Sequence, residues 1–322
     1  MNETKTNVQS NIPVLDRWNL EIIGIVLVVL FFLVAPFFIY PVFLMKAMSY
    51  AILGMSVNLL LGYVGLLSFG HAAFFGLSAY MFGHFAKEMD FGVALSMLIA
   101  VSGGTLLGVL FAMIAVRRIE FYFAMITLAL AQLVYFFCVQ AEFTGGDDGL
   151  QGIPRGEILG FSLLENSHLY GFVLLMFLFC LLFVFRIINS PFGEMLKAIR
   201  ENPERVTSLG CSPRTYKFIA FVLSAFLASI GGALKALVFQ IAALPDVHWL
   251  MSGDGVLMAL VGGIGTLIGP IVGALFIVWA QDGLAEIGMS VVVMQGLLFM
   301  ATVLLFRKGI VGELGRLKKY FR

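Results

Sequence analysis

Polar side chains are rare in the long apolar runs of this chain, and those that occur are the first candidates for chemistry. Within a membrane, such groups either line a path for a solute or hydrogen-bond to a neighbouring helix. For each residue taken singly, the sequence leaves both interpretations open. The candidates to border a translocation path are Asn58, Ser68, Gly70, His71, Thr127, Gln132 and Thr266.

His71 follows a glycine-interrupted stretch, GYVGLLSFGHAAFFG, that would end one membrane helix and start another. The start of a helix exposes backbone N–H groups and a partial positive charge, which could attract a carboxylate. One hypothesis is therefore that Ser68 and His71 border free N–H groups on a path. The alternative is that Gly65 and Gly70 allow tight packing and that His71 bonds a neighbouring carbonyl.

The sequence carries no signature of catalysis. It has no nucleotide-binding loop, nucleophile elbow or zinc-binding helix, and its four histidines lack the spacing of metal ligands. We therefore expect a protein that is not an enzyme and that holds no metal or cofactor. None of the 19 acidic residues falls deep in a predicted span, which disfavours coupling to protons or sodium. Lys235 is the clear charge inside a span. Its position near the outer end favours a side chain that reaches to the surface over a functional role.

Composition places the chain among the all-α polytopic membrane proteins. Of its 322 residues, 61% are hydrophobic and 12% charged, with a mean hydropathy of +1.00. The net charge of +1 gives no indication of a nucleic-acid partner, because the basic residues lie beside spans. We expect about 8–9 transmembrane helices, since each apolar run is near the length that crosses a bilayer. The apolar runs are 20–44, 47–65, 66–86, 92–116, 121–140, 169–187, 217–244, 256–281 and 289–306.

Lysine and arginine set the expected orientation. The N-terminal tail 1–19 and the basic tail 307–322 are expected in the cytoplasm. The first bundle, 20–187, has an acidic loop at 141–168 that is expected outside and that contains a glycine-rich ordered turn. The second bundle is 217–306.

The count of crossings requires that 256–281 begin and end on one side. VGGIGTLIGP (261–270) supplies a break, with Pro270 suited to the start of a second helix. We therefore expect a re-entrant segment, with a kinked full span as the alternative. The similar break at 62–76 hints at a weak internal repeat.

A polar stretch, 188–216, separates the two bundles and is named here the coupling segment. The pattern after Pro191 predicts a short amphipathic helix, and Gly210 suits a left-handed helix cap. We expect this segment to face the cytosol and dock a soluble partner. The residues expected to carry the docking are Glu194, Lys197, Arg200, Glu201 and Gly210.

Five stretches, in this order, resemble the LivM-type permease subunit of branched-chain amino acid ABC importers. They are GYVGLLSFGHAAFFGLSAY (62–80), FYFAMITLALAQ (121–132), TGGDDGLQGIP (144–154), SPFGEMLKAIRENPERVTSLG (190–210) and ALVGGIGTLIGPIVGA (259–274).

The resemblance implies a multi-pass protein of the bacterial inner membrane that carries branched-chain or other hydrophobic amino acids. It implies a heterodimer with a related permease subunit, two cytosolic ATPase subunits and an extracytoplasmic substrate-binding protein. Urea, short amides or aromatic acids are the alternative substrates within the same class. A stand-alone channel or secondary transporter, or a membrane-bound sensor, is the alternative from another class.

Overall fold

The computed structural model describes residues 14–118, 120–158 and 160–285, together with 293, 296–297, 299–300 and 309–310. Most of the predicted N-terminal tail 1–19, of the last predicted span 289–306 and of the tail 307–322 lies outside the described residues.

The first half of the chain is a series of apolar helices. These are α1 (Val14–Val34), the 3₁₀ turn η1 (Ala35–Phe37), α2 (Pro41–Asn58), the π-helical turn η2 (Leu59–Val64), α3 (His71–Lys87), α4 (Val93–Ala115) and α5 (Glu120–Gln140). The first predicted boundary between spans, at 44–47, lies earlier in the structure, between η1 and α2. The chain turns before Pro41 because proline is favoured at the first position of a helix.

Short elements and then further helices follow. They are η3 (Glu142–Thr144), η4 (Gly146–Asp148), β1 (Leu150–Gln151), β2 (Glu157–Ile158), β3 (Phe161–Ser162), α6 (Asn166–Ile188), α7 (Pro191–Glu201), α8 (Pro203–Ser208), α9 (Pro213–Phe239), β4 (Ile241–Ala242), α10 (Leu244–Val247), α11 (Trp249–Gly262) and α12 (Gly269–Ala285). Strand β1 pairs with β4, and β2 pairs with β3, both antiparallel.

Within the described part of the chain, five helical segments are long and apolar enough to cross a membrane. They are 41–64, 93–115, 121–140, 166–188 and 213–239. The all-α membrane class is therefore confirmed, whereas the count of 8–9 spans stays a prediction.

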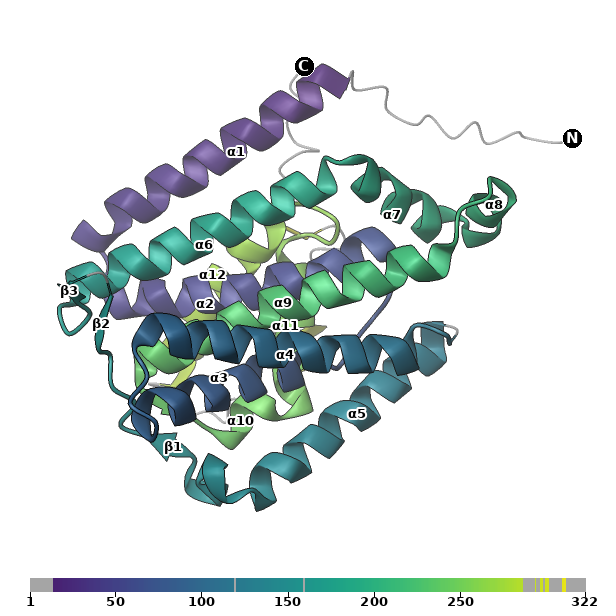
Figure 1. Cartoon of the computed structure of the whole chain (residues 1–322). Coiled ribbons are helices and arrows are strands. Elements are labelled where there is room, and N and C mark those ends of the chain that lie inside the picture. The colour runs from purple at the N-terminus through teal and green to yellow at the C-terminus, as the bar shows by residue number, and fades with distance from the viewer. Residues whose placement is uncertain are drawn as a thin grey trace, which may run out of the picture.

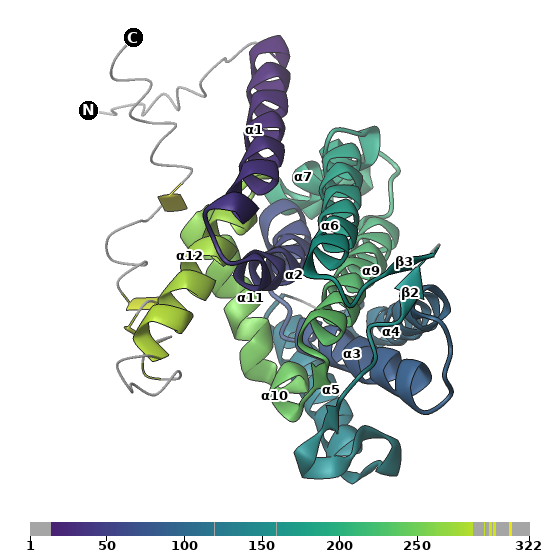
Figure 2. The ribbon, with the colours of Figure 1, turned by 90° about the vertical axis from the view of Figure 1, so that its left-hand side faces the viewer.

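Two of these segments form the centre of the bundle. The apolar windows of 41–64 and 213–239 are 89% and 83% buried, against 33%, 28% and 39% for α4, α5 and α6. Helix α9 packs against α2, α3 and α4 (Figures 1 and 2). Small residues make this packing possible: a Cβ on Gly232 would meet the Phe75 carbonyl carbon at 2.6 Å. Close approach of this kind is how membrane helices associate without a hydrophobic driving force.

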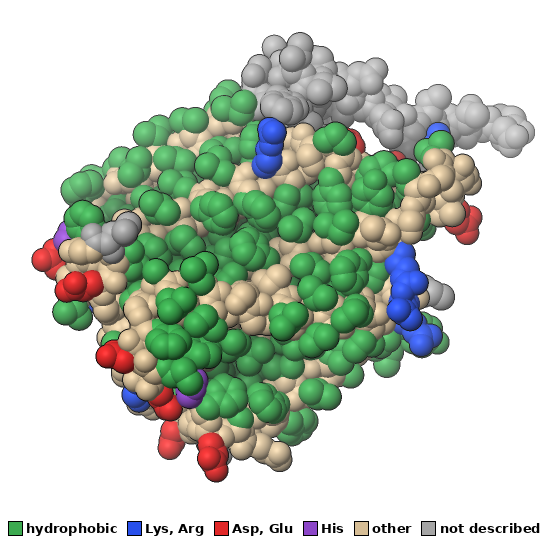
Figure 3. All heavy atoms as spheres, in the orientation of Figure 1, with side chains coloured by type: hydrophobic (Ala, Val, Ile, Leu, Met, Phe, Trp, Pro, Cys, Tyr) green, Lys and Arg blue, Asp and Glu red, His purple; other side chains and the backbone are tan. Residues whose placement is uncertain are grey.

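The face drawn in Figure 3 is mainly hydrophobic, and most of its charged side chains lie toward the two ends of the helices. The coupling segment lies at the same end as the α4–α5 connection, which carries Arg117 and Arg118 (Figure 1). Strands β1–β3 lie at the opposite end. Such a surface suits a protein surrounded by lipid between two aqueous layers.

The predicted break within 256–281 is present as two helices, α11 and α12, that pack against each other and against α2. Gly263 and Gly265 have φ of 125° and 76° in the connection, and Pro270 follows the first residue of α12, as expected. Asn58, at the end of α2, bonds the connection at Thr266, whereas Lys46, near the start of α2, pairs with Asp282 at 2.5 Å. Helix α12 therefore runs antiparallel to α2.

Candidate functional site

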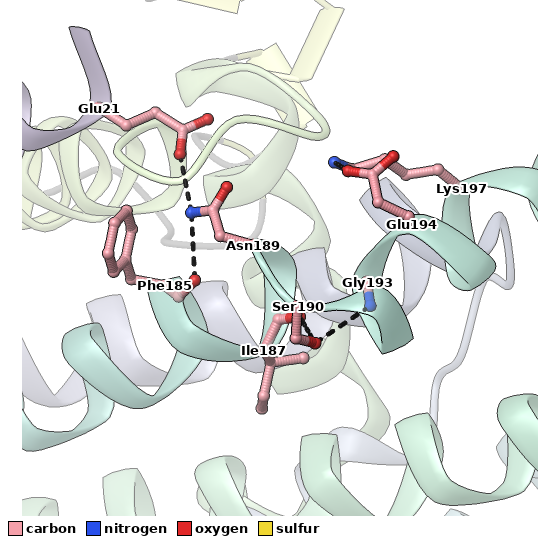
Figure 4. Close-up of polar contacts among 8 residues, drawn as sticks. All are labelled: Glu21, Phe185, Ile187, Asn189, Ser190, Gly193, Glu194 and Lys197. Atoms are coloured by element: carbon pink, nitrogen blue, oxygen red, sulfur yellow. Dashed lines mark hydrogen bonds and ion pairs between the residues drawn. The ribbon is translucent and has the colours of Figure 1, made fainter. Parts of the chain in front are cut away.

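The coupling segment is firmly attached to the bundle where it begins. The Ser190 hydroxyl accepts a hydrogen bond from Gly193 N at 3.4 Å and donates to Ile187 O at 2.7 Å (Figure 4). Gly193 is required because a Cβ there would meet the Ile187 carbonyl oxygen at 2.6 Å. The Asn189 amide donates to Glu21 of α1 at 3.0 Å and to Phe185 O at 3.2 Å. These contacts fix the angle at which α7 leaves α6.

Helix α7 is amphipathic, as the sequence predicted. Gly193, Leu196 and Ile199 are buried against the bundle, whereas Glu194 and Glu201 are exposed. The Lys197 ammonium pairs with the Glu194 carboxylate at 2.7 Å across one turn. The helix therefore has an apolar face that holds it in place and a charged outer face.

The predicted cap at Gly210 is also present, although it ends α8 rather than α7. Gly210 has φ of 83°, its N–H donates to Thr207 O at 2.9 Å, and Cys211 N donates to Val206 O at 3.3 Å. This is the pattern of a left-handed helix end, which glycine adopts without strain. Helix α7 ends earlier because the Asn202 side chain caps α8 by accepting from Arg205 N.

Arg200 is exposed, as the acids of α7 are, but its guanidinium also contacts the bundle. One of its N–H groups donates to the carbonyl of Gly62, in the π-helical turn that ends α2. That carbonyl lies in the last turn, where carbonyls lack a partner within the helix. Sequence reasoning grouped Arg200 with the docking residues and missed this inward contact.

Asn58 and Thr266, two of the predicted path residues, lie together at the second break. The Asn58 side chain donates to Thr266 O and accepts from Gly265 N, both at 2.9 Å. The Thr266 hydroxyl donates to Gly263 O at 2.8 Å and accepts from Gly269 N at 3.1 Å. These bonds satisfy backbone groups that a break in a membrane helix would otherwise leave unpaired.

His71 and Ser68 lie in a separate buried cluster at the start of α3. The His71 ring is fully buried, with Nδ1 at 3.3 Å from Ser68 O and Nε2 at 2.6 Å from the Ser224 hydroxyl of α9. The Ser224 hydroxyl in turn bonds Ser56 O of α2 at 2.8 Å. The imidazole and the Ser224 hydroxyl together link α3, α9 and α2, which agrees with the packing alternative.

The hypothesis of free N–H groups beside His71 does not hold for three neighbouring backbone donors, because side chains accept from them. Phe69 N donates to the Thr127 hydroxyl at 3.2 Å, Gly70 N to the Ser68 hydroxyl at 3.2 Å, and Ala72 N to the Ser252 hydroxyl at 2.8 Å. Buried backbone donors need such partners. Thr127 is therefore brought to the cluster, and Ser252 is a member that the sequence did not indicate. Gln132, half-buried on α5, shares no hydrogen bond with the other candidates in the described part of the chain.

Asp246 and Asp254, which lie between the predicted spans 217–244 and 256–281, are buried. Asp246 of α10 pairs with Lys235 at 2.6 Å and accepts from Ala243 N at 3.1 Å. The preferred interpretation of Lys235 as a surface-reaching lysine is therefore wrong: its side chain is 10% exposed and ends on a carboxylate. Asp254 is buried on α11 and bonds Gln281 of α12. Asp246 is carried by the short helix α10, and Asp254 by α11, which packs in the bundle.

The glycine-rich stretch 144–154 forms the expected ordered turn. Gly145, Gly149 and Gly152 all have positive φ, near 70°, and β1 lies against β4. Gly149 approaches β4 so closely that a Cβ would meet the Ala242 carbonyl oxygen at 2.5 Å. Among the described residues, no group of three His, Cys, Asp or Glu side chains could hold a metal ion.

Comparisons with known proteins agree with this arrangement. Residues 40–306 match the family described as branched-chain amino acid transport system / permease component. The chain is 26% identical over 285 residues to the "High-affinity branched-chain amino acid transport system permease protein LivM" of Escherichia coli and 25% identical to that of Salmonella typhimurium. Each match covers 80% of this chain and 66% of the relative, so the chain spans slightly less than two thirds of these relatives.

A third relative is the "Probable branched-chain amino acid transport permease protein LivM" of Methanocaldococcus jannaschii. It is 29% identical over 186 residues, which cover 56% of this chain and 53% of the relative. No solved structure matches the chain. Because the family match spans most of the described residues and all five resembling stretches, the chain belongs to the permease component family of branched-chain amino acid transport systems.

Proposed function

We propose that this chain is the membrane-spanning permease subunit of an ATP-binding-cassette importer for branched-chain or other hydrophobic amino acids. The observation that carries the proposal is α7, an amphipathic helix with its apolar face buried and its acidic residues exposed beyond the end of the bundle. A stand-alone channel needs no such helix, whereas a transporter driven by a separate ATPase needs a rigid contact surface.

The partners follow from the same proposal. The chain pairs with a related permease subunit, and two cytosolic ATPase subunits contact the coupling segment through Glu194, Lys197 and Glu201. An extracytoplasmic binding protein delivers the substrate at the opposite end, where β1–β3 lie. Energy enters through the ATPases. This agrees with membrane-embedded polar groups that are tied in hydrogen bonds or ion pairs, as His71 and Lys235 are.

The proposal is tested by reconstitution of this chain in liposomes with the partner permease, the ATPase subunits and the binding protein that it names. We expect uptake of radiolabelled leucine that requires ATP and each of the components. A matched control omits only the binding protein and should abolish uptake while this chain remains inserted. ATP-independent uptake by this chain alone would contradict the proposal and support a channel or secondary transporter.

The substrate class is tested separately on the binding protein. We expect leucine, isoleucine or valine to raise its melting temperature, with urea, short amides and aromatic acids as the comparison ligands. If only urea, a short amide or an aromatic acid stabilises the binding protein, the substrate assignment changes and the transporter class stays the same.

A further inference from the structure

The Arg200 side chain of the coupling segment reaches both glycine-rich breaks of the membrane helices. The first break is defined here as 59–70, between α2 and α3, and the second as 263–268, between α11 and α12. The Arg200 guanidinium donates to Gly62 O in the first break. Its side chain also lies over both breaks. A Cβ on Gly65 would meet Arg200 Cγ at 3.0 Å, and a Cβ on Gly265 would meet Arg200 Nη1 at 3.5 Å.

The two breaks are in direct contact with each other. A Cβ on Gly62 would meet Gly265 N at 2.7 Å, so only glycine allows the two backbones to approach this closely. Asn58 then joins them through its two hydrogen bonds to Gly265 and Thr266. Movement of either break is therefore coupled to the other.

Both breaks also have the backbone of a hinge. Gly65 and Gly265 adopt φ of 82° and 76°, a region that other residues rarely occupy. Residues 59–64 form a π-helical turn, a conformation concentrated at functional positions in helices. Helix α7, by contrast, is held rigidly on α6 by Ser190 and Gly193.

We propose that Arg200 is a positioning residue that transmits movement of α7 to both breaks, so that displacement of the coupling segment shifts the α11–α12 connection relative to α2. This inference rests on the proposed function for the origin of the movement. The contact itself exists within the chain and can be tested without partners.

The first test is hydrogen–deuterium exchange on the full chain in lipid nanodiscs. Arg200→Gln removes the charged donor, and Arg205→Gln, on exposed α8, is the matched control. We expect Arg200→Gln to speed exchange at 263–268 at least fivefold, with α4 unchanged as an internal reference. Arg205→Gln should match the wild type, and Arg200→Lys, which keeps a charged donor, should fall between. Unchanged exchange at 263–268, or an equal rise in α4, would overturn the inference.

The second test separates this inference from the proposed function. In the reconstituted complex, ATP binding should change exchange at 263–268 in the wild type and in Arg205→Gln, and this response should be lost in Arg200→Gln. If the wild-type complex imports substrate and the Arg200→Gln complex keeps the full exchange response to ATP, the role of Arg200 is overturned. The importer function would stay intact. Lack of ATP-driven import by the wild type, with faster exchange in isolated Arg200→Gln, would instead contradict the proposed function.

Discussion

The Asn58 side chain pairs with the backbone of the α11–α12 connection, accepting from Gly265 N and donating to Thr266 O at 2.9 Å each. One amide thereby satisfies two backbone groups, Gly265 N and Thr266 O, where the helix is interrupted. We expect Asn58→Ala to lower the free energy of unfolding by about 1–3 kcal/mol, because it leaves buried backbone groups unpaired. Denaturant titration in mixed micelles measures this. Gln132→Ala, at a half-buried position outside this network, should change little, and equal losses in the two variants would contradict the role of Asn58.

His71 should behave as a structural residue. It is fully buried between Ser68 O and the Ser224 hydroxyl, so His71→Ala removes the hydrogen bond between α3 and α9. We expect His71→Ala to lower the melting temperature and the amount of assembled protein together with uptake. Lost uptake with unchanged melting temperature and assembly would instead support the path hypothesis.

The Lys235–Asp246 pair should matter more for stability than the exposed Lys46–Asp282 pair. Removing one member of a buried pair leaves an uncompensated charge, which costs about 3–5 kcal/mol, whereas exposed pairs contribute about 0–1 kcal/mol. We therefore expect Lys235→Met to be strongly destabilising and Lys46→Met to be mild. Adding Asp246→Asn to Lys235→Met should recover much of the loss, because asparagine still accepts from Ala243 N. No recovery in the double variant would refute the ion-pair account.

The orientation of the α11–α12 pair is tested by cysteine labelling. A Cβ on Gly283 meets no described residue within 4 Å, and Gly283 is exposed, so Gly283→Cys suits labelling. We expect an impermeant thiol reagent to label it from outside, as it labels Glu157→Cys, in a background with Cys211→Ser. The wild-type protein, which keeps Cys211, provides the separate reference for labelling from the cytosol. Labelling of Gly283→Cys from the cytosol alone would show a full span instead of a re-entrant pair.

The membrane class, the amphipathic helix α7 and the break between α11 and α12 could be predicted from the sequence. Hydropathy over about 20 residues predicts the membrane class, and the amphipathic pattern after Pro191 predicts α7. The break at Gly262–Pro270 follows from glycine and proline chemistry, which is local. Each of these features depends on residues that are close in the chain, so a single sequence is enough to predict them.

Contacts between distant segments were not predictable in the same way. The Asn58–Gly265 and Arg200–Gly62 bonds join residues far apart in the chain. Lys235 and Asp246 are 11 positions apart, but nothing local shows that the turn between them folds inward. Polar residues in spans could therefore be identified as candidates, whereas their partners required the packing of α2, α9 and α11.

The central claim, that ATP hydrolysis on partner subunits is coupled to transport through α7, is tested most directly by the ratio of substrate imported to ATP hydrolysed. In liposomes holding the complete complex, we expect Glu194→Lys to insert and hydrolyse ATP while its ratio falls at least tenfold below the wild type. The control Glu157→Lys, at the opposite end of the molecule, should keep the wild-type ratio. A wild-type ratio in Glu194→Lys, with import at the normal rate, would contradict the account.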